Sequence, residues 1–134
     1  MADHPNAELV RRGYDAFIAG DMEWLNEHLH DNIVWHEPGN NFLSGDVRGR
    51  DAVLAHFAKQ VQHFLPEFDV HDVVANDDHA IALVSVQARR LDNQETMGGR
   101  YVHIFHIDAE GKTLESWIFN EDQAALDQFL QGLG

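Results

Sequence analysis

The side chains that can do chemistry in this sequence are carboxylates and histidines. The chain has 23 Asp and Glu residues, ten His residues and no Cys. Without cysteine it can form no disulfide, no thiolate nucleophile and no cysteine-ligated zinc site. Its serines, Ser44, Ser85 and Ser116, lie in no Gly-x-Ser-x-Gly segment, and no phosphate-binding or dinucleotide-binding glycine motif follows a predicted strand. Proton transfer and metal binding are therefore the chemistries to weigh.

The spacing of the histidines does not favour a metal site. No His-Glu-x-x-His segment is present. His103 and His106 fall on opposite faces of a predicted strand, because strand side chains alternate. His56 and His63 are about two helical turns apart, too far to converge easily on one ion. We expect neither a metal nor a cofactor, and we interpret the histidines as solvated or hydrogen-bonded.

A carboxylate stands at the end of a predicted strand over residues 32–37. Glu37 directly precedes Pro38, and alternation places its side chain on the same face as Trp35. In one interpretation Glu37 is a solvated strand-end carboxylate. In the other it is a base, which requires an apolar surround that tunes the pKa of the carboxyl group.

Helices precede most of the strands that must position these groups. From Pro5, apolar residues recur at helical spacing until Gly20, and Asp21 is placed to cap a second, short helix that includes Leu29. A glycine-containing loop over 40–49 leads to a third helix, whose apolar stripe runs to Phe64 and stops at Pro66.

After Pro66 the pattern changes to short strands at 68–75, 79–88, 99–107 and 113–120, separated by turn-forming residues. Apolar residues from Ala125 to Leu130 return to helical spacing, and Asp122 is a better candidate for the cap of this last helix than for a catalytic acid. The order predicts an α+β fold, with N-terminal helices packed on one face of a curved, mostly antiparallel sheet.

Composition limits the partners and the location of the protein. With 134 residues and no linker-like stretch, the chain has the size of a single domain. Its net charge of -14 repels phosphate backbones and anionic lipid surfaces, so nucleic acid and membranes are excluded as expected partners. No stretch is apolar enough to span a bilayer or to act as a signal peptide. We expect a soluble, cytoplasmic protein.

Short segments along almost the whole chain match one family. They are AGD at 19–21, WHEPG at 35–39, LSGD at 43–46, GRDAV at 49–53, DAEGK at 108–112 and WIFNED at 117–122. The sequence resembles SnoaL-like and ketosteroid isomerase-like proteins of the nuclear transport factor two superfamily. The resemblance implies one cystatin-like, cone-shaped domain over residues 1–134 with a deep apolar pocket for a small apolar ligand, and a homodimer through the outer sheet face.

The resemblance also suggests roles for three residues. Glu37 matches the place of the isomerase base, and His103 matches a strand position that donates to the developing oxyanion. The helix donor falls opposite Gly13, one residue from Tyr14, which corresponds to about 100° of helix rotation. His103 and Tyr14 therefore keep alternative interpretations, as a sheet histidine satisfied by backbone or water and as a core tyrosine.

Aromatic residues are the expected ligand contacts. Trp35 shares the Glu37 face, and Trp117 with Phe119 lies on the last strand, so the three can wall one cavity. Asn120 lies in the region where some cyclase relatives keep an acid. Plain core packing is the competing interpretation for each aromatic residue.

Two functions from different classes remain open at this point, because the fold hosts isomerases, cyclases, epoxide hydrolases, dehydratases and binding modules. The first is a cofactor-independent acid–base enzyme acting on a small apolar carbonyl compound, with Glu37 as base and His103 and Tyr14 holding the oxyanion. The alternative is a non-catalytic ligand-binding or dimerisation module. Convergence of Glu37 and His103 on one cavity discriminates between them.

Overall fold

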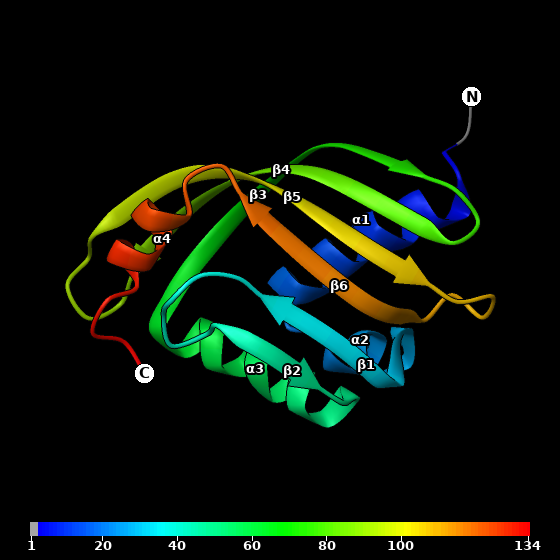
Figure 1. Cartoon of the computed structure of the whole chain (residues 1–134), viewed down its shortest axis with the longest axis horizontal. Helices are drawn as coiled ribbons and strands as arrows, with labels where there is room; N and C mark the ends of the chain where they lie inside the picture. The colour runs from blue at the N-terminus through cyan, green and yellow to red at the C-terminus, as the bar shows by residue number, and fades with distance from the viewer. Residues whose placement is uncertain (1–2) are drawn as a thin grey trace.

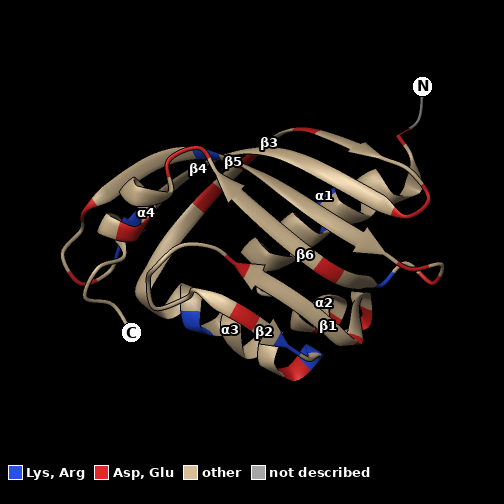
Figure 2. Ribbon diagram, viewed as in Figure 1, with Lys and Arg blue, Asp and Glu red and all other residues tan. Residues whose placement is uncertain are grey.

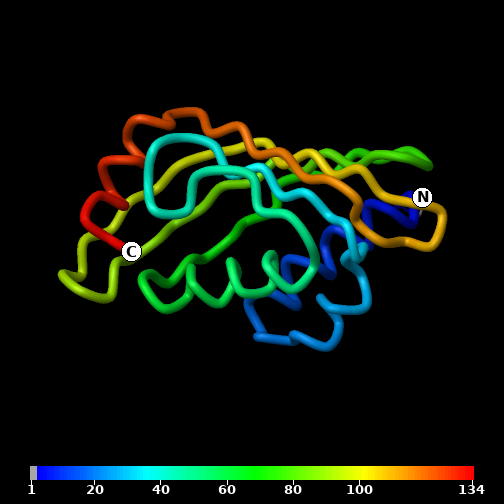
Figure 3. The backbone as a smooth tube through the Cα atoms, turned by 60° about the horizontal axis from the view of Figure 1, so that its bottom comes forward, coloured from blue at the N-terminus to red at the C-terminus, as the bar shows by residue number. Residues whose placement is uncertain are grey.

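The computed structural model describes residues 3–134, so two residues of the predicted domain lie outside the described part. In these residues six strands form one curved sheet, and helices lie inside its curve (Figures 1 and 3). The elements are α1 (Pro5–Ala19), α2 (Met22–His28), β1 (Leu29–Glu37), β2 (Gly45–Arg48), α3 (Arg50–His63), β3 (Phe64–Ala75), β4 (His79–Arg90), β5 (Thr96–Ile107), β6 (Thr113–Asn120) and α4 (Gln123–Phe129). This is the predicted α+β cone.

The helix ends follow the expected capping chemistry. Pro5 begins α1, where its missing N–H is no loss. Gly20 closes α1 at φ 70°, a left-handed conformation that favours glycine. Asp21 and Asp122 each accept a backbone N–H at the start of α2 and α4. The interpretation of Asp122 as a helix cap is therefore confirmed.

Several element boundaries differ from the sequence prediction, and β4 and β5 are each longer than the predicted strands at 79–88 and 99–107. Leu29 begins β1 instead of ending α2, and 45–48 forms the edge strand β2 instead of a loop. Helix α3 ends at His63, and Phe64 starts β3, which contains Pro66. Proline is tolerated there because β3 is the other edge of the sheet and needs no ladder on its outer side.

The sheet has the order β2-β1-β6-β5-β4-β3, with β1 and β6 parallel and all other pairs antiparallel. Strand β5 is the central support of the site. Its inward side chains Tyr101, His103 and Phe105 face the helices, while the intervening residues face outward. On β6, Ser116 and Ile118 share the inner face.

Two apolar clusters hold the layers together. The larger contains Ile33, Trp35, Val53 and Phe57 with residues from α1, α2, β4 and β5. The smaller joins α4 to the sheet and consists of Leu43, Phe64, Ala88, Phe129 and Leu130. This second cluster packs α4 against one end of the sheet (Figure 1).

Candidate active site

A cavity of about 590 Å³ lies between the curved sheet and the helices. Apolar and aromatic side chains dominate its wall, with a few polar groups among them, as is typical of small-molecule sites. Helices α1, α2 and α3, the long strands and α4 all contribute. The residues used below that line it are Tyr14, Trp35, Glu37, Phe57, Gln60, Tyr101, His103 and Asn120.

Glu37 is held at the end of β1 by three donors, which together form the carboxylate cluster. Its Oε1 accepts from Trp35 Nε1 at 2.9 Å, from His56 Nε2 at 3.0 Å and from Gln60 Nε2 at 3.4 Å. Trp35 reaches it because it shares the strand face, and His56 and Gln60 because they are one turn apart on α3. The Glu37 side chain is 13% exposed.

The second oxygen of Glu37 is available for chemistry. Within residues 3–134, Oε2 has no hydrogen-bond partner, and it is not fully buried. It therefore borders accessible space. The cluster fixes the carboxylate through one oxygen and leaves the other free to accept a proton.

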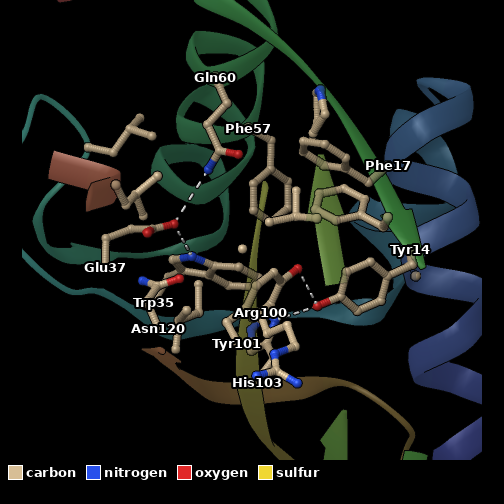
Figure 4. Close-up of a pocket in the computed structure, with 18 of the residues that line it drawn as sticks. Tyr14, Phe17, Trp35, Glu37, Phe57, Gln60, Arg100, Tyr101, His103 and Asn120 are labelled. Carbon is tan, nitrogen blue, oxygen red and sulfur yellow. Dashed lines mark hydrogen bonds between the residues drawn. The ribbon is translucent and has the colours of Figure 1, made fainter. Parts of the chain in front are cut away.

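A chain of hydrogen bonds on the other side of the cavity forms the hydroxyl relay. Tyr14 Oη lies 2.9 Å from Tyr101 Oη and 3.0 Å from His103 Nδ1. The other ring nitrogen of His103, Nε2, lies 2.5 Å from Ser116 Oγ. Figure 4 shows Glu37 and Gln60 at one side of the cavity and Tyr14, Tyr101 and His103 at the other, with the Trp35 ring between the two groups.

Burial keeps the relay uncharged. It raises the pKa of Tyr14, with further upward contributions from Tyr101 and from the negative charge of Glu37. It also raises the pKa of Tyr101, although the hydrogen bond with Tyr14 works against the increase. The His103 imidazole has its pKa lowered by burial to about 3. At neutral pH the two phenols and the imidazole of the relay are therefore all uncharged.

The low pKa of His103 predicts an acid-sensitive fold. Between pH 6.5, the ordinary His pKa, and about pH 3, His103 is protonated in the unfolded chain but neutral in the native state. The stability contributed by neutral His103 is present above pH 6.5 and is lost as the pH falls. We expect His103→Gln to reduce the slope of unfolding free energy against pH by up to one proton, about 1.4 kcal/mol per pH unit, in urea titrations from pH 7 to pH 5. An unchanged slope would contradict this assignment.

The structure brings Glu37, His103 and Tyr14 to one cavity. Trp35 lines it between the two polar groups, with its ring centroid 4.8 Å from Phe57 and 5.1 Å from His103. Asn120 also lines it and donates to Gln123 Oε1 at the start of α4. The rotation that placed Tyr14 in doubt does not turn its hydroxyl away from the cavity.

The placement of Trp117 and Phe119 in the cavity wall is wrong. Both lie on the outer face of β6, where Trp117 stacks on His36 at 5.7 Å and Phe119 is 58% exposed. Alternation gives them the face opposite to Ser116, Ile118 and Asn120. Two aromatic residues are therefore displayed outside the cone.

Four polar residues of the site were not identified from the sequence. Tyr101 stands two residues before His103, which alternation alone places on the same face. His56 and Gln60 have the one-turn spacing of a helix face. Nothing in the sequence around Ser116, beyond its alternation with Trp117, indicates a role in the site, because that role depends on a contact with the neighbouring strand β5.

Residues 3–134 contain neither a metal-binding cluster nor a membrane-spanning helix. No group of three or more His, Asp or Glu side chains is arranged to hold a metal ion. No helix in the described chain is both long and apolar enough to cross a bilayer.

A curved sheet over helices, with a carboxylate and a phenol–imidazole chain in one cavity, places the chain among the cone-shaped α+β proteins. A family model described as a SnoaL-like domain matches residues 10–116. The chain belongs to the SnoaL-like family. The uncharacterised protein Rv0034 of Mycobacterium tuberculosis is 30% identical over 129 residues, covering 87% of this chain and 98% of that protein.

Solved structures share the fold. Bal32a, from a soil-derived mobile gene cassette, is 30% identical with a TM-score of 0.82, over 94% of this chain and 96% of that one. An NTF2-like protein from Burkholderia xenovorans is 20% identical with a TM-score of 0.87, over 98% and 99%. IdmH from Streptomyces antibioticus, a proposed polyketide cyclase, is 18% identical with a TM-score of 0.76, over 97% and 100%.

Proposed function

We propose that this protein is a cofactor-independent acid–base enzyme that moves a proton next to the carbonyl group of a small apolar compound, as isomerases and cyclases do. The observation that carries the proposal is the convergence of Glu37 and the hydroxyl relay on one largely apolar cavity. Membership of the SnoaL-like family and the likeness to IdmH support this class of chemistry.

The reaction needs a base and a donor on opposite sides of a substrate. Glu37, anchored through Oε1, takes a proton from the carbon beside the carbonyl group, and the electron pair moves to the carbonyl oxygen. A phenol of the relay donates a hydrogen bond to that oxygen as its charge develops. The carboxylic acid of Glu37 then returns the proton to carbon, so no cofactor or oxidant is required.

The same convergence argues against a module that only binds ligands. A binding role needs the apolar wall but gives no reason for a carboxylate held by three donors to face a chain of buried hydroxyl groups. The high negative charge of the chain disfavours anionic substrates, so neutral compounds are the better candidates. Nucleic acid and membrane surfaces are unsuitable partners for the same reason.

The test is carbon-proton exchange in D₂O with a panel of β,γ-unsaturated and cyclic ketones. We expect the protein to catalyse deuterium incorporation beside the carbonyl group of at least one compound, as followed by NMR. Binding is followed in parallel by tryptophan fluorescence, since Trp35 and Trp24 line the cavity. Compounds that bind without any exchange would favour the binding module instead.

We also propose that the partner of the outer sheet face is a second copy of this chain. Leu83, Val102 and Phe119 are aligned across β4, β5 and β6, and Leu83 and Phe119 are 40% and 58% exposed. An apolar row in the centre of a sheet suits a two-fold contact, because the same row on the partner covers it.

Replacing Phe119 by Ser should weaken such a dimer by about 10–100-fold, the effect of exposing one large apolar side chain. Light scattering with size-exclusion chromatography at several concentrations measures the change. Ile18→Ser on α1 is a matched control, because Ile18 is 56% exposed on the opposite layer. A wild-type protein that is monomeric at high concentration would contradict the proposal.

A further inference from the structure

The hydroxyl relay contains four groups in a row, and each can donate only a limited number of protons. Ser116, Tyr14 and Tyr101 have one O–H each, and a neutral imidazole has one N–H. The order in space is Ser116, His103, Tyr14, Tyr101, with each neighbouring pair at hydrogen-bond distance. The direction of one bond therefore determines the direction of the next.

Ser116 sets the direction at the inner end. Its side chain is fully buried, and within residues 3–134 the partner of its Oγ is His103 Nε2. A buried hydroxyl group needs an acceptor for its proton, and the imidazole nitrogen is the one within reach. Ser116 therefore donates, and His103 Nε2 accepts.

The tautomer of His103 follows from this bond. A neutral imidazole with an unprotonated Nε2 has its proton on Nδ1, so Nδ1–H donates to the Tyr14 oxygen. The Tyr14 proton is then directed to the Tyr101 oxygen, 2.9 Å away. Tyr101 is the last member of the relay, and its own proton has no acceptor among the described residues.

From this geometry we propose that Tyr101 is the catalytic residue that donates directly to the developing oxyanion, with Tyr14, His103 and Ser116 as positioning residues that orient it. The proposal rests on the proposed carbonyl chemistry and deepens it, since sequence reasoning placed the donors at His103 and Tyr14. Both ring nitrogens of His103 are occupied by protein groups, which leaves it no bond to give a ligand.

The direction of the relay also defines the substrate class. A relay that ends in a free O–H recognises a hydrogen-bond acceptor, such as a ketone oxygen, and strengthens its bond as that oxygen becomes an enolate. The substrate must therefore present a carbonyl oxygen toward Tyr101 and an acidic carbon toward Glu37. Compounds whose only polar group is a donor do not suit this end of the cavity.

The tautomer is tested without any ligand by ¹⁵N NMR of the imidazole, with the His103 signals assigned by their loss in His103→Gln. We expect Nδ1 to be protonated and Nε2 unprotonated. In Ser116→Ala this preference should be lost, while Ser85→Ala, on the outer face of β4, should leave it unchanged. A proton on Nε2 in the wild-type protein would overturn the proposal. This result does not depend on whether any ketone is converted, so it separates failure of the relay from failure of the proposed function.

The terminal donor is tested with 4-nitrophenolate, whose oxygen mimics an enolate and whose absorbance reports binding. Loss of a hydrogen bond to a charged oxygen should make Tyr101→Phe bind it about 10–100-fold more weakly. Tyr14→Phe should cost less than about tenfold, because Tyr101 keeps its own proton. A larger loss in Tyr14→Phe than in Tyr101→Phe would show that Tyr14 is the direct donor and would reject the assignment.

Discussion

Replacing Glu37 by Gln is expected to leave the fold intact and to lower carbon-proton exchange by about 10²–10⁴-fold, the usual contribution of a positioned general base. The Gln amide oxygen can still accept from Trp35 and His56, so the β1 end and α3 keep their contacts. What the variant lacks is a second oxygen that can accept a proton. The rate of deuterium incorporation into a converted ketone, measured by NMR, reports the loss.

An exposed carboxylate outside the cavity provides the control for this variant. Glu67 is exposed on β3, and Glu67→Gln makes the same chemical change away from the cavity. It should keep the wild-type rate. Undiminished exchange in Glu37→Gln, with the same unfolding midpoint as the wild type, would remove Glu37 from the mechanism.

Arg90→Met is expected to destabilise the fold and to loosen the end of the cone. Arg90 is only 7% exposed, and its Nη1 donates to the backbone oxygens of Phe129 and Gln131 at 2.8 and 2.9 Å. Its Nε and Nη2 bind both oxygens of Asp92. Methionine fills much of the volume but leaves the two backbone carbonyl groups without their donor, and an unpaired carbonyl group in a buried setting is destabilising.

Urea unfolding measures this loss, with Arg89→Met as the matched control. Arg89 is exposed and bonds Gln94 within its own hairpin, so its replacement should change stability by no more than about 0.5 kcal/mol. Ligand binding adds a second readout, because Leu126 and Leu130 of the α4 region line the cavity. Equal stability of the two variants would show that Arg90 does not anchor α4.

Glu37→Gln and Arg90→Met test different features of the cavity. Glu37 acts through a free oxygen in the cavity, whereas Arg90 keeps the cavity closed by tying the segment after α4 to β4. Acidic residues are spread over strands, helices and loops around the molecule, and Lys and Arg are scattered among them (Figure 2).

Local physical chemistry was enough to predict most of the fold. Helical periodicity located α1 and α3, and the Asp caps located the starts of α2 and α4. The errors in the predicted element boundaries lie where the conformation of a segment depends on contacts with another strand. Residues 45–48 became a strand only because β1 supplies the pairing ladder, and Pro66 was accepted in β3 only because that strand is an edge.

The sequence by itself also determined which side chains share a strand face. Alternation grouped Trp35 with Glu37 and set Phe119 opposite to Asn120, because successive side chains of a strand point to opposite sides. Alternation does not determine which face of β6 turns inward. The interpretation that put Trp117, Phe119 and Asn120 in one cavity wall was inconsistent with alternation, because Asn120 lies on the opposite face from the two aromatic residues.

Only the tertiary structure decided which face is covered and which polar groups meet. Helices pack against the face of β6 that carries Ser116 and leave Trp117 and Phe119 outside. Tyr14 meets Tyr101 and His103 across 87 and 89 residues of sequence, and Glu37 meets His56 across 19. No local periodicity encodes such distances, because they arise when the curved sheet brings separate elements around one cavity. The residue types were readable from the chain, but their hydrogen-bond directions exist only once those elements are packed.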